Sequence, residues 1–87
     1  MTIHVELFGI PRERAGVERV DVEGKTLRDV LLELESRFPK LAEACISKGE
    51  LQAGYLANIN ARKFTRDSSI MLADATTVLI LSADAGG

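Results

Sequence analysis

The strongest constraint on the fold is an unbroken apolar run near the C-terminus, residues 77–82 with the sequence TVLILS. Nearly every position is β-branched or aliphatic, as in a central strand that is covered on both faces. The run is far shorter than the roughly 20 residues needed to span a bilayer as a helix, so it indicates a buried strand. The chain has 87 residues, which is enough for one core and one domain, residues 1–87.

Four further strands are predicted from local patterns. Apolar and polar residues alternate over residues 2–7 and again over 55–59, which is typical of strands with one face on a core. Val17 to Val22 predicts a second strand, and a short one is expected around Lys63 and Phe64. The first two strands should form a hairpin whose long, charged connection runs from Pro11 to Arg14.

One main helix is predicted after the hairpin. Thr26 lies three residues before Asp29, as in a capping box, and apolar residues then follow helical spacing up to Pro39. Residues 41–49 fit either a second short helix or an irregular segment. The order of elements predicts an α+β fold: a mixed sheet of four or five strands, the first and last in the middle, with the helix across one face.

The composition excludes several classes of function. The formal net charge is −2 and both signs are scattered, which gives no basic surface for nucleic acid or an anionic membrane. The single cysteine cannot form an internal disulfide, and residues 1–6 do not look like a signal peptide. We therefore expect a cytoplasmic protein that acts on neither nucleic acid nor membranes.

The C-terminal segment is the first candidate for function. It reads ADAGG and contains no large side chain; its members are Ala83, Asp84, Ala85, Gly86 and Gly87. Fully extended, five residues reach at most roughly 17 Å, enough to carry the terminal carboxylate into a cleft of another protein. Glycines allow such a segment to approach a surface closely. We interpret 83–87 as a flexible reactive tail; the alternative is an ordinary frayed terminus.

A second candidate is the face of the sheet that the main helix leaves uncovered. If Val78 and Ile80 face the helix, Leu79 and Leu81 point to the opposite side. Phe8 and Leu56 should point the same way, and together these four apolar side chains would form an exposed patch for a partner protein. The alternative is that residues 41–49 wrap around and bury the patch.

Other catalytic chemistry has little support in the sequence. His4 is the single histidine and is expected to be an exposed strand residue. Cys45 lies among apolar neighbours and is expected to be a structural thiol. No cluster has the spacing of metal ligands, so we expect no metal site.

The motifs in order resemble the MoaD/ThiS family of ubiquitin-like sulfur carriers, nearly end to end. The resemblance rests on VELFG and PRERAG near the N-terminus, TLRDVL at the helix start, FP, NIN, LAD before the last strand and the final GG. It implies a β-grasp fold. It also implies that an ATP-dependent adenylyltransferase related to ubiquitin-activating enzymes activates Gly87, that a sulfur donor converts Gly87 to a thiocarboxylate, and that Gly86 and Gly87 thread through narrow channels of the partners.

By the same resemblance, Phe8 and Leu81 dock the carrier on a larger partner. The N-terminal half is most similar to the small subunit of molybdopterin synthase, which implies that the chain is not an enzyme by itself and binds no cofactor. Molybdopterin synthesis is therefore the first expected pathway, with thiamine, cysteine or tRNA thiolation behind it. Where the family often has Gly-Asp and prolines, this chain has Ala75-Thr76 and Ser82-Ala83-Asp84. The remaining hypotheses are a lysine-conjugated modifier, an interaction module with an inert tail and a thiol enzyme using Cys45.

Overall fold

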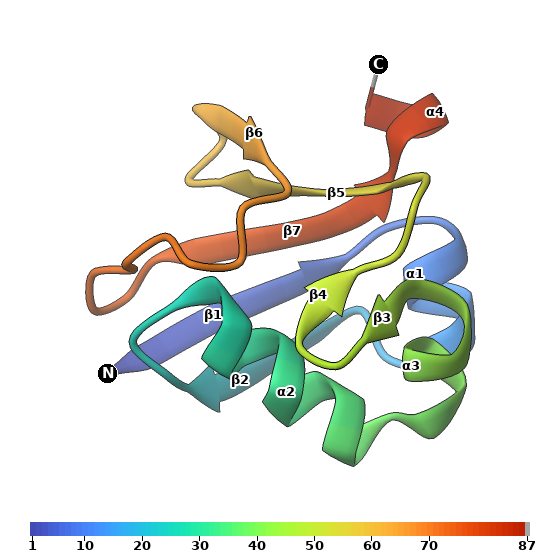
Figure 1. Ribbon diagram of the computed structural model, residues 1–87, viewed down its shortest axis with the longest axis horizontal. Helices are drawn as coiled ribbons and strands as arrows, with labels where there is room; N and C mark the ends of the chain where they lie inside the picture. The colour runs from blue at the N-terminus through green and yellow to red at the C-terminus, as the bar shows by residue number, and fades with distance from the viewer. Residues whose placement is uncertain (87) are drawn as a thin grey trace.

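The computed structural model describes the backbone of residues 1–86 and the side chains of residues 1–84. Its centre is a five-stranded mixed sheet in the order β2-β1-β7-β5-β6 (Figure 1). The strands are β1 (Thr2–Leu7), β2 (Arg19–Glu23), β5 (Tyr55–Ile59), β6 (Lys63–Thr65) and β7 (Thr77–Ser82). The strands β1 and β7 are parallel, and the other pairs are antiparallel. The α+β prediction, with the first and last strands central, is confirmed.

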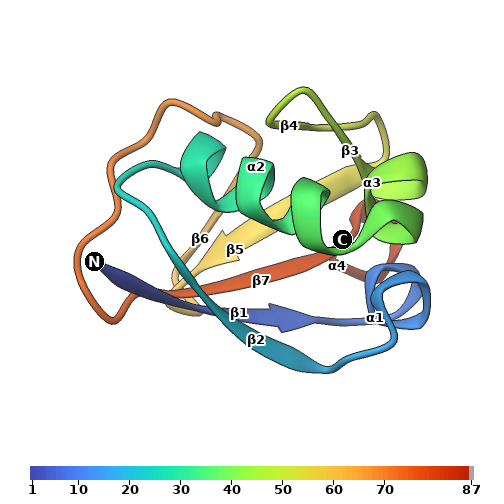
Figure 2. The same ribbon diagram turned by 90° about the horizontal axis from the view of Figure 1, so that it is seen from below.

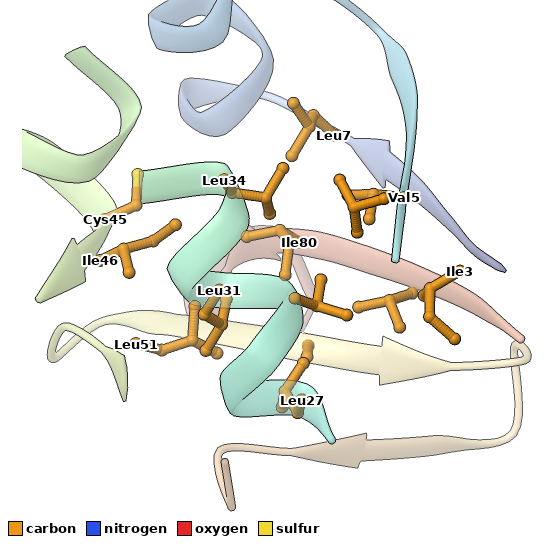
Figure 3. Close-up of a cluster of buried hydrophobic side chains, with 14 of the residues drawn as sticks. Ile3, Val5, Leu7, Leu27, Leu31, Leu34, Cys45, Ile46, Leu51 and Ile80 are labelled. Carbon is orange, nitrogen blue, oxygen red and sulfur yellow. The ribbon is translucent and has the colours of Figure 1, made fainter. Parts of the chain in front are cut away.

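The main helix, α2 (Leu27–Arg37), crosses one face of this sheet (Figure 2). It begins at a capping box: the Thr26 hydroxyl accepts from the Asp29 amide, and the Asp29 carboxylate accepts from the Thr26 amide. The buried stripe of the helix packs on the inward residues of β1 and β7 (Figure 3). That stripe consists of Leu27, Val30, Leu31 and Leu34.

Residues 41–49, for which the sequence left two interpretations, are mostly regular. They contribute to α3 (Pro39–Cys45) and to a small hairpin of β3 (Ile46–Ser47) and β4 (Glu50–Leu51). Leu41, Cys45 and Ile46 belong to the same core as α2, and these elements lie on the α2 side of the sheet (Figure 2). The alternative in which this segment covers the opposite face is therefore wrong.

The predicted charged loop after β1 is instead a short helix, α1 (Ile10–Ala15). Gly9, with φ of 69°, precedes the helix, and Gly16, with φ of 78°, ends it by donating its amide to the Arg12 carbonyl. Pro11 occupies the first turn, where its missing amide proton removes no helical hydrogen bond. The glycines and the proline, interpreted as loop residues, therefore start and end a helix. The fourth helix, α4 (Ala83–Gly86), is a single turn that follows β7.

Candidate functional site

The C-terminal segment leaves the sheet from the end of its central strand. Ser82 is paired with Tyr55 on β5, and the Ala83 amide then donates to the Gly54 carbonyl at 2.7 Å. The turn α4 follows at once, at the same end of the sheet as α1 (Figures 1 and 2). Gly87, the predicted reactive residue, lies outside the described residues. Of the other predicted tail residues, Ala83 is partly buried and Asp84 is exposed, while only the backbone of Ala85 and Gly86 is described.

The predicted apolar side chains lie on one face of the sheet, opposite α2. Leu56 on β5 is directly opposite Leu81 on β7. Phe8 continues β1 one residue beyond the pair of Leu7 and Ile80, which places it beside Leu81. Leu79 lies two residues before Leu81 on β7, so its side chain points to the same side of the sheet. We call this side of the sheet the outer face.

The exposure of these four side chains differs from the prediction at one position. Phe8 is 49% exposed, and Leu56 and Leu79 are partly buried, but Leu81 is only 5% exposed. Because β7 is the central strand, Leu81 has Leu56 on one side and Phe8 on the other, and α4 begins two residues after it. The expectation that the Leu81 side chain is exposed is therefore wrong, and its role in docking stays a prediction.

Phe64 is a member of the outer face that the sequence analysis missed. It lies on β6 opposite Asn58, which in turn pairs with Leu79, and its side chain is 51% exposed. Residues directly opposite in antiparallel strands share a face, so Phe64 extends the apolar surface to the edge of the sheet. Correct pairing of the hairpin formed by β5 and β6 would have revealed it.

A small hollow of about 190 Å³ lies on the outer face beside α1. Two loose ion pairs border it: Arg12 with Glu18 at 3.7 Å and Arg19 with Glu6 at 3.8 Å. The Arg12 guanidinium also lies over the Phe8 ring, 5.7 Å from its centroid. The lining residues are Glu6, Leu7, Phe8, Arg12, Glu18, Arg19 and Leu79.

The sequence singled out two further side chains with possible chemistry, His4 and Cys45. Cys45 is fully buried, and burial raises the pKa of its thiol despite a contact with the Tyr55 hydroxyl. The exposed His4 lies 2.8 Å from Asp21, and no group of three or more potential metal ligands occurs among the described residues. None of the described helices is long and apolar enough to cross a membrane. Among the described residues, the candidate functional site is the outer face together with the base of the C-terminal segment.

A helix packed across a mixed sheet with parallel central first and last strands is the β-grasp fold of ubiquitin-like proteins. The model of the ThiS family matches residues 5–87. The chain therefore belongs to the ThiS family of ubiquitin-like sulfur carriers and modifiers. A search of curated proteins gave no match.

Several solved structures are similar over nearly the whole chain. The small archaeal modifier protein 1 of Methanosarcina acetivorans is 27% identical with a TM-score of 0.80, covering 99% of this chain and 96% of that one. CysO, solved in the Amycolatopsis orientalis BexX/CysO complex, is 24% identical with a TM-score of 0.78, over 98% and 99%. A putative molybdopterin converting factor subunit 1 from Pyrococcus furiosus is 24% identical with a TM-score of 0.71, over 94% and 97%. At 24% identity, the last two similarities concern the fold.

Proposed function

We propose that this protein is a cytosolic sulfur carrier whose C-terminal Gly87 is adenylated and then converted to a thiocarboxylate. The observation that carries the proposal is the place where the C-terminal segment leaves the fold. In a ThiS-family fold, the chain leaves the central strand at Ala83, next to an apolar outer face, and the small residues 84–87, with their two glycines, follow in the sequence. A partner that binds the outer face would therefore also lie within reach of the C-terminus.

The chemistry requires an activating enzyme because a free carboxylate has no usable leaving group. An adenylyltransferase related to ubiquitin-activating enzymes would join the Gly87 carboxylate to AMP from ATP and release pyrophosphate. Hydrosulfide, or a donor that supplies sulfur at the same oxidation level, would then attack the acyl carbon, break its bond to AMP and leave the thiocarboxylate at Gly87. The protein itself contributes the carboxylate and the docking surface, and ATP is bound by the partner.

We propose molybdopterin synthesis as the first pathway, with this chain as the small subunit beside a larger synthase subunit. The support is the resemblance of the N-terminal motifs and the similarity in fold to the Pyrococcus furiosus protein. Sulfur transfer to thiamine, cysteine or tRNA synthesis uses the same thiocarboxylate and differs only in the acceptor enzyme.

A second candidate function is conjugation of Gly87 to lysine side chains of other proteins. It is favoured by the 27% identity to a small archaeal modifier protein over nearly the full length of both chains. Activation of the terminus is common to both functions, so the acceptor separates them. Recovery of peptides in which Gly87 is joined to lysine would favour the modifier.

The test is to incubate the purified protein with ATP, a purified adenylating enzyme of this class and a sulfur source, and to record the intact mass. The proposal expects a gain equal to the exchange of one oxygen for sulfur, localised to Gly87. A chain lacking Gly87 should gain nothing, whereas Glu33→Gln, on the exposed side of α2, should react as the unchanged chain does. An enzyme that modifies its own carrier but not this chain, or sulfur gained without Gly87, would overturn the proposal.

A further inference from the structure

The side chain of Arg12 contacts three different parts of the protein. Its Nε donates to the Leu7 carbonyl at 3.0 Å, its guanidinium lies over the Phe8 ring, and its Nη2 is 3.7 Å from a Glu18 carboxylate oxygen. The hydrogen bond to Leu7 and the contact with Phe8 orient the guanidinium, whereas the ion pair with Glu18, the residue before β2, is loose. An arginine held in this way loses little side-chain entropy when it binds a partner.

The remaining part of the guanidinium is available for binding. Within the described part of the chain, Nη1 has no hydrogen-bond acceptor, and the contact of Nη2 with Glu18 is longer than a good hydrogen bond. The Arg12 side chain is 45% exposed, and it lines the hollow together with the partly buried Leu79. The hollow therefore combines a fixed set of N–H donors with an apolar wall.

We propose that Arg12 is the recognition residue of the outer face and that it binds a carboxylate of the activating enzyme. The occupant of the hollow is an aspartate or glutamate side chain of that enzyme, with an apolar neighbour lying over Phe8 and Leu79. A carboxylate matches the planar fork of a guanidinium, and the charge-assisted hydrogen bonds are stronger than those to a neutral carbonyl. The inference rests on the proposed function and adds to it the charge of the partner.

The position of the hollow agrees with this role. Arg12 belongs to α1, which lies at the same end of the sheet as α4, where the tail leaves β7 (Figures 1 and 2). The hollow is continuous with the apolar outer face through Phe8 and Leu79. A partner carboxylate bound to Arg12 would thus fix the carrier close to the base of the segment that carries Gly87.

The partner's charge can be tested because the hollow contains both signs. If the occupant is a carboxylate, Glu18 competes with it for Arg12, so Glu18→Gln should leave the affinity unchanged or increase it. If the occupant is a lysine or arginine, Glu18→Gln should weaken binding and Arg12→Gln should not. The two variants therefore give opposite results for the two kinds of partner.

The experiment measures the KM for the carrier in ATP–pyrophosphate exchange, with the adenylating enzyme that modifies the unchanged chain. We expect Arg12→Gln to raise KM roughly 10- to 100-fold, the range for loss of a hydrogen-bonded charge. Arg12→Lys should recover only part of the affinity, because it keeps the charge but not the fork. Arg19→Gln should have a smaller effect, since that side chain is 74% exposed.

The matched control is Arg62→Gln, which removes one positive charge from the exposed loop between β5 and β6, at the end of the sheet away from α1. Its KM should equal that of the unchanged chain, and thermal melting should show that every variant is folded. Equal losses for Arg12→Gln, Arg19→Gln and Arg62→Gln would overturn the inference in favour of general electrostatic attraction. If Arg12→Gln has the same KM as the original chain, and the original chain is fully activated, the inference is overturned while the proposed function stands. Failure to activate the unchanged chain would overturn the proposed function and the inference with it.

Discussion

The Ala83 amide donates a hydrogen bond to the Gly54 carbonyl, and within the described residues this is the last backbone bond from the C-terminal segment to the body of the protein. Four residues follow it, which reach at most roughly 14 Å when extended. The partner that binds Gly87 must therefore come within this distance of Ala83. The bond thus defines the point from which the reach of the C-terminal segment is counted.

Replacing Ala83 with proline tests the contribution of this bond to stability. Proline removes the donor but is compatible with the first position of a helical turn such as α4. We expect a loss of about 1 kcal/mol, or a melting temperature about 4–8 °C lower for a domain of this size. Ala83→Ser keeps the donor and serves as the control in thermal melting followed by circular dichroism. Equal melting temperatures for both variants would show that the bond contributes nothing.

The two ends of the outer face should respond differently to mutation. Leu81 is 5% exposed, so Leu81→Ala should lower the free energy of unfolding by at least about 2 kcal/mol. Phe64 is 51% exposed on an edge strand, so Phe64→Thr, which keeps a strand-forming residue, should change it by less than about 0.5 kcal/mol. Urea denaturation distinguishes the two. A small effect at Leu81 would mean that its burial contributes little to stability.

This difference determines how the docking surface can be mapped. A loss of partner binding in a Leu81 variant would combine weaker docking with weaker folding. Phe8 and Phe64, both about half exposed, allow docking to be measured in a folded protein.

Much of this architecture is predictable because its signals are local. The capping box at Thr26 and the apolar spacing of α2 fix the main helix, and the uninterrupted apolar run fixes the central strand. The helix α1 was missed because Gly9 and Gly16 are common in loops as well as at helix ends. Whether they start and end a helix depends on backbone angles that residue type alone does not determine.

The sequence predicted the face of the sheet on which the side chains of the candidate site lie, but not how exposed each side chain is. Alternation along a strand determines which face a side chain shares, and it placed Phe8, Leu56, Leu79 and Leu81 correctly together. Exposure depends on neighbours from other strands, which the sequence does not specify. The position of Arg12 over Phe8 likewise arises from the turn into α1.

The capping box predicts a stability that depends on pH. The Lys25 and Thr26 amides donate to the Asp29 carboxylate and hold the pKa of that side chain below its usual value of 3.8. The folded protein therefore binds this proton less readily than the unfolded chain. The stabilisation is present above pH 3.8 and is lost as the pH falls through the lower value of the folded state.

Two variants measure this effect by urea denaturation across the pH range. Thr26→Ala removes the hydroxyl that accepts from the Asp29 amide and should cost about 1 kcal/mol. Asp29→Asn removes the titrating charge, so its difference from the unchanged chain should be largest near neutral pH and should shrink in acid. A difference that stays constant down to pH 2 would mean that the Asp29 charge does not stabilise the helix start.

The Cys45 thiol should be chemically inert in the folded protein. It is fully buried in the core, and burial raises the pKa above its ordinary value of 9.0, so the reactive thiolate is scarce at neutral pH. We expect iodoacetamide to label Cys45 in urea but not in buffer, as measured by intact mass. Cys45→Ser should still form the thiocarboxylate at Gly87, provided that thermal melting shows it folded. Rapid labelling of the native protein, together with loss of sulfur transfer in a folded Cys45→Ser variant, would instead assign the chemistry to the thiol.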